Sequence, residues 1–105
     1  MRYATPPLVL LAAACTPTQS DQIMNIVEAQ VRMPAGARPL TEYKRYYYRD
    51  GSMIIGKYLR SGAPGREWIS KEKRKLVFDG GCGVVNVTFS LEANKIISVD
   101  CNGVS

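Results

Sequence analysis

The strongest constraint on the fold is a strict two-residue alternation near the C-terminus. Apolar and polar side chains alternate over residues 85–91 and again over residues 97–101. Two such runs with a short polar connection predict an antiparallel hairpin with one buried face. Asn94 suits the left-handed position of a three-residue hairpin loop. That loop predicts the cross-strand pairs Val85–Cys101, Val87–Val99, Phe89–Ile97 and Leu91–Lys95.

A second hairpin is predicted earlier in the chain. The pair Asp50-Gly51 separates two runs rich in Tyr and Ile, and it suits a type I′ turn, which needs positive φ at both central residues. With that turn, the predicted pairs are Tyr48–Met53, Tyr47–Ile54, Tyr46–Ile55 and Tyr43–Tyr58. One face then carries Tyr46, Tyr48, Met53, Ile55 and Leu59, and the other carries Tyr43, Tyr47, Ile54 and Tyr58. We expect one face to pack on a helix and the other to be half covered.

The helix is predicted over residues 22–32. Asp21 is a suitable N-cap, and Pro34 ends the helix. The inward face follows helical spacing with Ile23, Ile26, Val27, Gln30 and Val31. A short strand with Trp68 as a core residue is predicted over residues 66–70. The sequence therefore predicts an α+β domain over residues 21–105, with one N-terminal helix packed on a four- to five-stranded antiparallel sheet built from two hairpins.

The first 15 residues have the features of an export signal. Arg2 supplies a positive charge, and the apolar run 8–14 is far shorter than the roughly 18–20 residues that span a bilayer. The residues Ala12-Ala13-Ala14-Cys15 resemble the lipobox of bacterial lipoproteins, although Ala12 stands where leucine is commonest. This resemblance implies a signal peptide over residues 1–14, acylation of Cys15 and a lipidated tether over residues 15–20. Thr16 after the cysteine implies the outer membrane, with the domain facing the periplasm.

Two other interpretations of this N-terminus are open. It can be an ordinary signal peptide with an incidental cysteine, or a buried N-terminal helix. Beyond the signal, the stretches MPAGARPL, EYKRYYY, DGGCGVVNV and VDCNG are similar to small exported proteins of alphaproteobacteria. That resemblance carries no functional residue across to this chain.

Export bears on the two later cysteines. Cys82 and Cys101 form an even pair, which in an exported domain predicts one disulfide. A bridge of this spacing stabilises a domain by about 3 kcal/mol in the loop-entropy estimate. Because Cys82 lies before the start of the strand that holds Val85, we expect a bend at residues 81–83 to bring the two sulfurs together.

Basic and aromatic residues indicate a binding surface. The formal net charge is +5, which attracts anionic partners. The predicted surface combines tyrosines, whose rings give flat contact area, with a basic run: Tyr43, Tyr47, Tyr58, Lys71, Lys73, Arg74 and Lys75. The alternatives are that the tyrosines form the sheet core and that the basic run is a solvated loop. The expected partners are the membrane, through Cys15, and anionic envelope components or an envelope protein, but not nucleic acid.

Catalytic patterns are missing from the sequence. The chain has no histidine, which excludes Ser-His-Asp and Cys-His catalysis and removes the commonest zinc ligand. Residues 79–83 lack the phosphate-loop pattern, and the acidic residues are scattered. We therefore expect a non-enzymatic accessory or binding module with no catalytic residue, metal or cofactor. The alternatives are a periplasmic inhibitor of a hydrolase such as lysozyme and a small subunit of an outer-membrane assembly complex.

Overall fold

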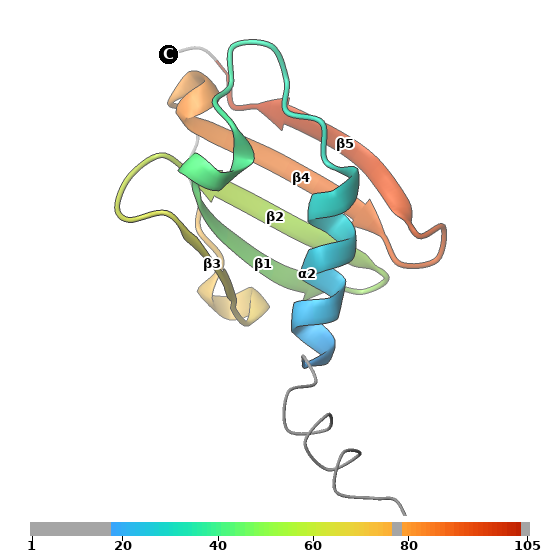
Figure 1. Ribbon diagram of the computed structural model, residues 1–105. Helices are drawn as coiled ribbons and strands as arrows, with labels where there is room; N and C mark the ends of the chain where they lie inside the picture. The colour runs from blue at the N-terminus through green and yellow to red at the C-terminus, as the bar shows by residue number, and fades with distance from the viewer. Residues whose placement is uncertain (1–17, 77–78, 104–105) are drawn as a thin grey trace, which may run out of the picture.

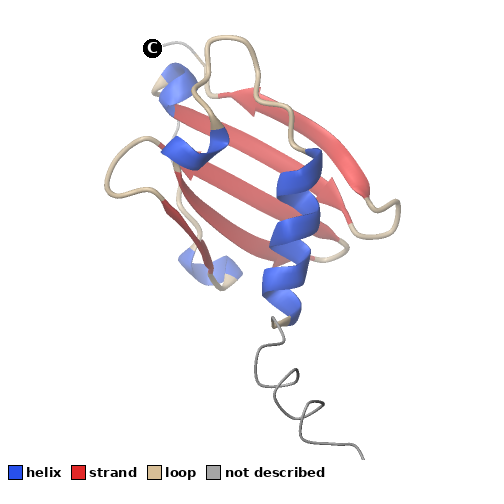
Figure 2. Ribbon diagram, viewed as in Figure 1, coloured by secondary structure: helices blue, strands red, loops and turns tan. Residues whose placement is uncertain are grey.

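A single α-helix lies across one face of a five-stranded sheet in the computed structural model, which describes residues 18–76 and 79–103 (Figure 1). The α+β class is therefore confirmed. The regular elements are α2 (Gln19–Gln30), β1 (Lys44–Asp50), β2 (Met53–Leu59), β3 (Gly65–Trp68), β4 (Val84–Ser90) and β5 (Lys95–Cys101). Three 3₁₀ turns complete the described chain: η1 (Leu40–Glu42), η2 (Lys71–Lys73) and η3 (Gly81–Gly83). Figure 2 shows the helix on one side of the sheet only.

The sheet is mixed, so the prediction of a purely antiparallel sheet is wrong. The strand order is β3-β1-β2-β4-β5, and β3 pairs with β1 in parallel. The reason lies in the loop of residues 60–64. Leu59 ends β2 beside Lys44 at the start of β1, and the loop passes that end of β1 to reach its other side. An antiparallel β3 would need the loop to travel the length of β1 as well, about 20 Å more.

The first hairpin turns one residue later than predicted. Asp50 pairs with Met53, which leaves Gly51 and Ser52 as the turn, so the predicted pairs are wrong. Gly51 has φ of 63°, and Asn94 is the only non-glycine residue with positive φ in the described chain. A type I′ turn needs two such residues, whereas glycine at the first central position alone meets the need of a type II′ turn. Each partner moves by two residues, so the predicted composition of the two faces still holds.

The second hairpin has the predicted register at one end and a bulge at the other. Val85 pairs with Cys101 and Val87 with Val99, as predicted. A register shift between Thr88 and Phe89 then places Phe89 opposite Ile96, so the predicted pairs Phe89–Ile97 and Leu91–Lys95 are wrong. The bulge turns Ile97 outward, where it is 51% exposed. Asn94 has φ of 55°, which confirms its left-handed position.

The helix starts earlier and faces the sheet differently than predicted. Thr18 is the N-cap, because its hydroxyl oxygen accepts a hydrogen bond of 3.1 Å from the backbone N–H of Asp21. Asp21 is therefore not the cap, and the helix includes two residues of the predicted tether. Met24, Val27 and Val31 are buried, whereas Ile26 is 43% exposed. These three buried residues follow helical spacing along the side of α2 that faces the sheet. Glu28 lies on the same side.

The predicted disulfide and bend are both present. Cys82 and Cys101 are bonded, with their Cα atoms 4.6 Å apart. The bend is η3, entered through Gly80 and Gly81, whose φ angles of 109° and 54° favour glycine. The bridge joins the segment before β4 to the end of β5. No helix within residues 18–76 and 79–103 is long and apolar enough to cross a membrane.

Candidate functional site

The predicted binding surface divides into two parts that lie apart. Tyr43, Tyr47 and Tyr58 have no exposed surface and belong to the core under α2, so their assignment to a binding surface is wrong. The alternative, that the tyrosines form the sheet core, describes what the structure shows. They lie on the face of the sheet that the helix covers, and their hydroxyls find partners inside the protein. The cations of the basic run are all exposed.

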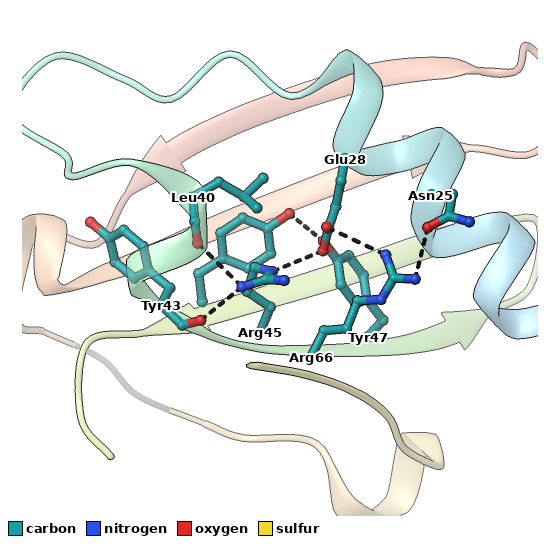
Figure 3. Close-up of polar contacts among 8 residues, drawn as sticks. Asn25, Glu28, Leu40, Tyr43, Arg45, Tyr47 and Arg66 are labelled. Carbon is teal, nitrogen blue, oxygen red and sulfur yellow. Dashed lines mark hydrogen bonds and ion pairs between the residues drawn. The ribbon is translucent and has the colours of Figure 1, made fainter. Parts of the chain in front are cut away.

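A cluster of ion pairs fixes the helix to the sheet, with Glu28 of α2 at its centre (Figure 3). Its Oε2 accepts hydrogen bonds of 2.8 Å from Arg45 Nε and from the hydroxyl of Tyr47. Its Oε1 lies 3.4 Å from Arg66 Nη1 on β3. Arg66 also donates to Asn25 Oδ1 at 2.7 Å, one turn earlier on the helix. The side chains of Glu28 and Arg45 are 16% and 10% exposed, so this is a largely buried, well-paired cluster.

The hydroxyl groups of two tyrosines from the sheet complete the cluster. Tyr47 and Tyr58 contact each other through their hydroxyls, and their rings meet edge to face with centroids 5.8 Å apart. Burial, followed by the neighbouring Tyr58 and Glu28, raises the pKa of Tyr47 far above its ordinary value. Burial also raises the pKa of Tyr58. Both hydroxyls are therefore protonated donors at neutral pH, and the site has the chemistry of a structural network rather than of an acid–base pair.

Gly56 favours this arrangement. It lies between Tyr47 on β1 and Val87 on β4 in the sheet register. A Cβ at this position would lie 3.0 Å from Tyr47 Cε1 and 3.2 Å from Tyr58 Cε1. A side chain at position 56 would force the two rings to shift by a few tenths of an ångström, so glycine suits their close packing. Neither Gly56 nor the partners of Glu28 were predicted from the sequence, although the helical spacing of Met24, Glu28 and Val31 is a signal that a carboxylate faces inward.

The exposed cations form the second part, which we call the basic segment: Lys71, Lys73, Arg74 and Lys75. Lys71 Nζ lies 3.0 Å from Asp50 Oδ1. Lys75 Nζ lies 5.0 Å from the centroid of the Tyr46 ring, within cation–π range. Burial raises the pKa of Tyr48, and the charge of Arg74 partly opposes this rise. Since Tyr46 and Tyr48 point away from α2, the basic segment lies at the uncovered face of the sheet.

A hollow of about 330 Å³ lies at another end of the sheet. Leu59, Val84 and glycines of the η3 region line it, and Arg60 and Asp79 are its charged residues. One cation and one carboxylate on an open, mostly apolar wall do not form a convergent set of catalytic groups. Within residues 18–76 and 79–103, no group of three or more His, Cys, Asp or Glu residues is placed to hold a metal ion.

Comparison with protein-family models, with curated proteins and with solved structures finds no match for this chain.

Proposed function

We propose that this protein is a small, non-enzymatic envelope lipoprotein, anchored through acyl chains on Cys15, whose domain is an accessory or binding module at the membrane surface. The lipobox-like residues before Cys15 support the anchor, and the residue at position 16 supports an outer-membrane location facing the periplasm. The bonded pair Cys82–Cys101 is consistent with an oxidising compartment.

The observation that carries the proposal is the closeness of Cys15 to the folded domain. The helix cap is Thr18, three residues after Cys15. Three residues reach at most about 11 Å even when fully extended. A lipid on Cys15 would therefore hold the domain against the bilayer surface rather than on a long flexible linker. A module held this way is suited to partners that are themselves at the membrane.

The state of the carboxylates supports a non-enzymatic role. Glu28 has both oxygens engaged by arginines and a tyrosine hydroxyl. Glu42, Asp50 and Glu67 each form an ion pair with a neighbouring cation. A glycosidase-type mechanism needs two carboxylates facing one reacting bond, and these four carboxylates instead face cations on different elements.

Intact mass spectrometry of the protein purified from bacterial membranes tests the anchor. Wild type should begin at Cys15 and carry the mass of acyl chains, whereas Cys15→Ala should be released or left unprocessed. The double variant Cys82→Ser/Cys101→Ser is the matched control, because it removes the other two cysteines and should keep the acyl mass. A wild-type mass with an intact Met1, or a cleaved chain without lipid, would contradict the proposal.

A further inference from the structure

We propose that the basic segment is a second membrane contact, which docks the domain on an anionic lipid bilayer through Lys73, Arg74, Lys75 and the neighbouring Leu76. The inference deepens the proposed anchoring, since it assigns the face of the domain that meets the bilayer. It rests on that proposed function for its biological setting, but its test does not require the lipid on Cys15.

The contacts of α2 show at which edge of the sheet the helix begins. Near its C-terminal end the helix contacts β5, where Gln30 bonds the backbone of Asn94 and Ile96. Further toward its N-terminus, Asn25 and Glu28 contact Arg66 on β3. The helix therefore begins toward the β3 edge of the sheet and ends toward the β5 edge.

The basic segment begins directly after β3, at this same edge. Residues 69 and 70 separate the end of β3 from η2. Figure 1 shows η2 and the N-terminal turn of α2 at the same lower end of the domain. η2 and the start of α2 therefore lie at the same end of the domain, although on opposite faces of the sheet, and a bilayer at that end would meet both.

The chemistry of the segment fits an anionic lipid surface. Lys71 is paired with Asp50, but among the described residues no ion pair is formed by Lys73, Arg74 or Lys75. Within residues 71–75, Glu72 is the one acidic residue. Leu76 follows them and is 64% exposed. Cations with an exposed leucine are typical of interfacial segments, in which the charges meet headgroups and the apolar side chain enters the acyl boundary.

Each cation held near an anionic membrane raises binding by about fivefold at moderate salt. Loss of three should therefore lower partitioning onto anionic vesicles by about 100-fold. The contribution should be lost in high salt, because exposed charges are screened beyond a Debye length.

The test uses the oxidised mature chain, residues 15–105 with Cys15→Ser, so that neither an acyl chain nor the apolar signal segment contributes. Its partitioning is measured by flotation on phosphatidylcholine vesicles with and without phosphatidylglycerol. The test variant adds Lys73→Gln, Arg74→Gln and Lys75→Gln. The matched control instead adds Arg32→Gln, Arg38→Gln and Arg60→Gln, which remove the same charge at exposed positions elsewhere. Near-ultraviolet circular dichroism of Trp68 checks that each variant is folded.

We expect the preference for phosphatidylglycerol to fall by about 100-fold in the test variant and by less than about fivefold in the control. Equal losses in both variants, or a parent chain without any preference for phosphatidylglycerol, would overturn the inference. Leu76→Ser provides an independent variant that keeps all charges, and unchanged vesicle binding by it would remove Leu76 from the contact. The mass spectrometry above reports on the anchor alone, so a failure of the anchor and a failure of this docking surface give different results.

Discussion

Replacement of Glu28 is the most direct test of how the helix is held on the sheet. Glu28→Gln keeps the size of the side chain and one carbonyl oxygen, but it removes the charge that faces Arg45 and Arg66. Breaking a buried ion pair costs about 3–5 kcal/mol because the remaining charge has no counterion. Here Arg45 keeps a hydrogen bond of 3.1 Å to the carbonyl of Tyr43, and the cluster is partly exposed. We therefore expect a loss of about 2 kcal/mol for Glu28→Gln and about 3 kcal/mol for Glu28→Ala.

Urea unfolding with the disulfide intact measures these values, and thermal unfolding should show a fall in Tm of about 8–16 °C for Glu28→Gln in a domain of this size. Glu92→Gln is the matched control, because Glu92 lies in the exposed β4–β5 loop, and it should change the free energy of unfolding by less than about 0.5 kcal/mol. A double-mutant cycle with Arg45→Met isolates the pair. A loss below about 0.5 kcal/mol for Glu28→Gln, or additivity of the two changes in the cycle, would refute the view that this ion pair fixes the helix.

Three further predictions concern the core and the disulfide. Gly56→Ala should destabilise the domain by about 2 kcal/mol in urea unfolding, because its methyl group would overlap the rings of Tyr47 and Tyr58. Replacing Cys82 and Cys101 by serine should cost about 3 kcal/mol relative to the oxidised protein, and a much smaller loss would show that the bridge constrains the unfolded chain little. Because burial raises the pKa values of Tyr47 and Tyr58 above the ordinary value of 10, the unfolded chain loses these protons first as pH rises. The stabilisation linked to these two raised pKa values is complete below about pH 10. Above that pH, the free energy of unfolding should fall by about 1.4 kcal/mol per tyrosine for each pH unit. Urea titrations from about pH 9 to pH 11 should show this fall, and Tyr47→Phe should make it shallower without removing it, because Tyr48 and Tyr58 also have raised pKa values.

The local patterns of the chain predicted where its two hairpins lie, but not their full registers. Alternation over residues 85–91 and 99–101 predicted which residues share a face, and Asn94 marked the turn, whereas Ile97 points outward against the prediction. The bulge opposite Phe89 was missed because it shifts the alternation by one residue, and with two adjacent isoleucines, Ile96 and Ile97, either one could face the core in the sequence pattern. The turn at Gly51 was missed for a related reason. A slip of two residues keeps every side chain on its face, so hydrophobic pattern alone does not select between the two registers.

The candidate site was harder to predict because it depends on contacts between distant segments. The tyrosines of the first hairpin have the composition of a binding surface, and only the position of α2 decides that Tyr43, Tyr47 and Tyr58 are covered. Glu28 meets Arg45 and the tyrosine hydroxyl from positions 17 and 19 residues away. A buried tyrosine needs a partner for its hydroxyl, and in this core the helix supplies a carboxylate.

The parallel strand β3 explains why the basic segment lies at the uncovered face. β3 is parallel to β1. β2 is antiparallel to β1, and β4 is antiparallel to β2, so β4 is also parallel to β1. β3 and β4 therefore run in the same direction, with β1 and β2 between them. Two parallel strands of one sheet require a crossover connection over a face of the sheet. Because α2 occupies one face, we expect the connection from β3 to β4 to use the other, and the described residues agree, since Lys75 lies over the Tyr46 ring on that face. The topology that made the sheet mixed therefore also brings the basic segment to the surface, at the edge where α2 begins.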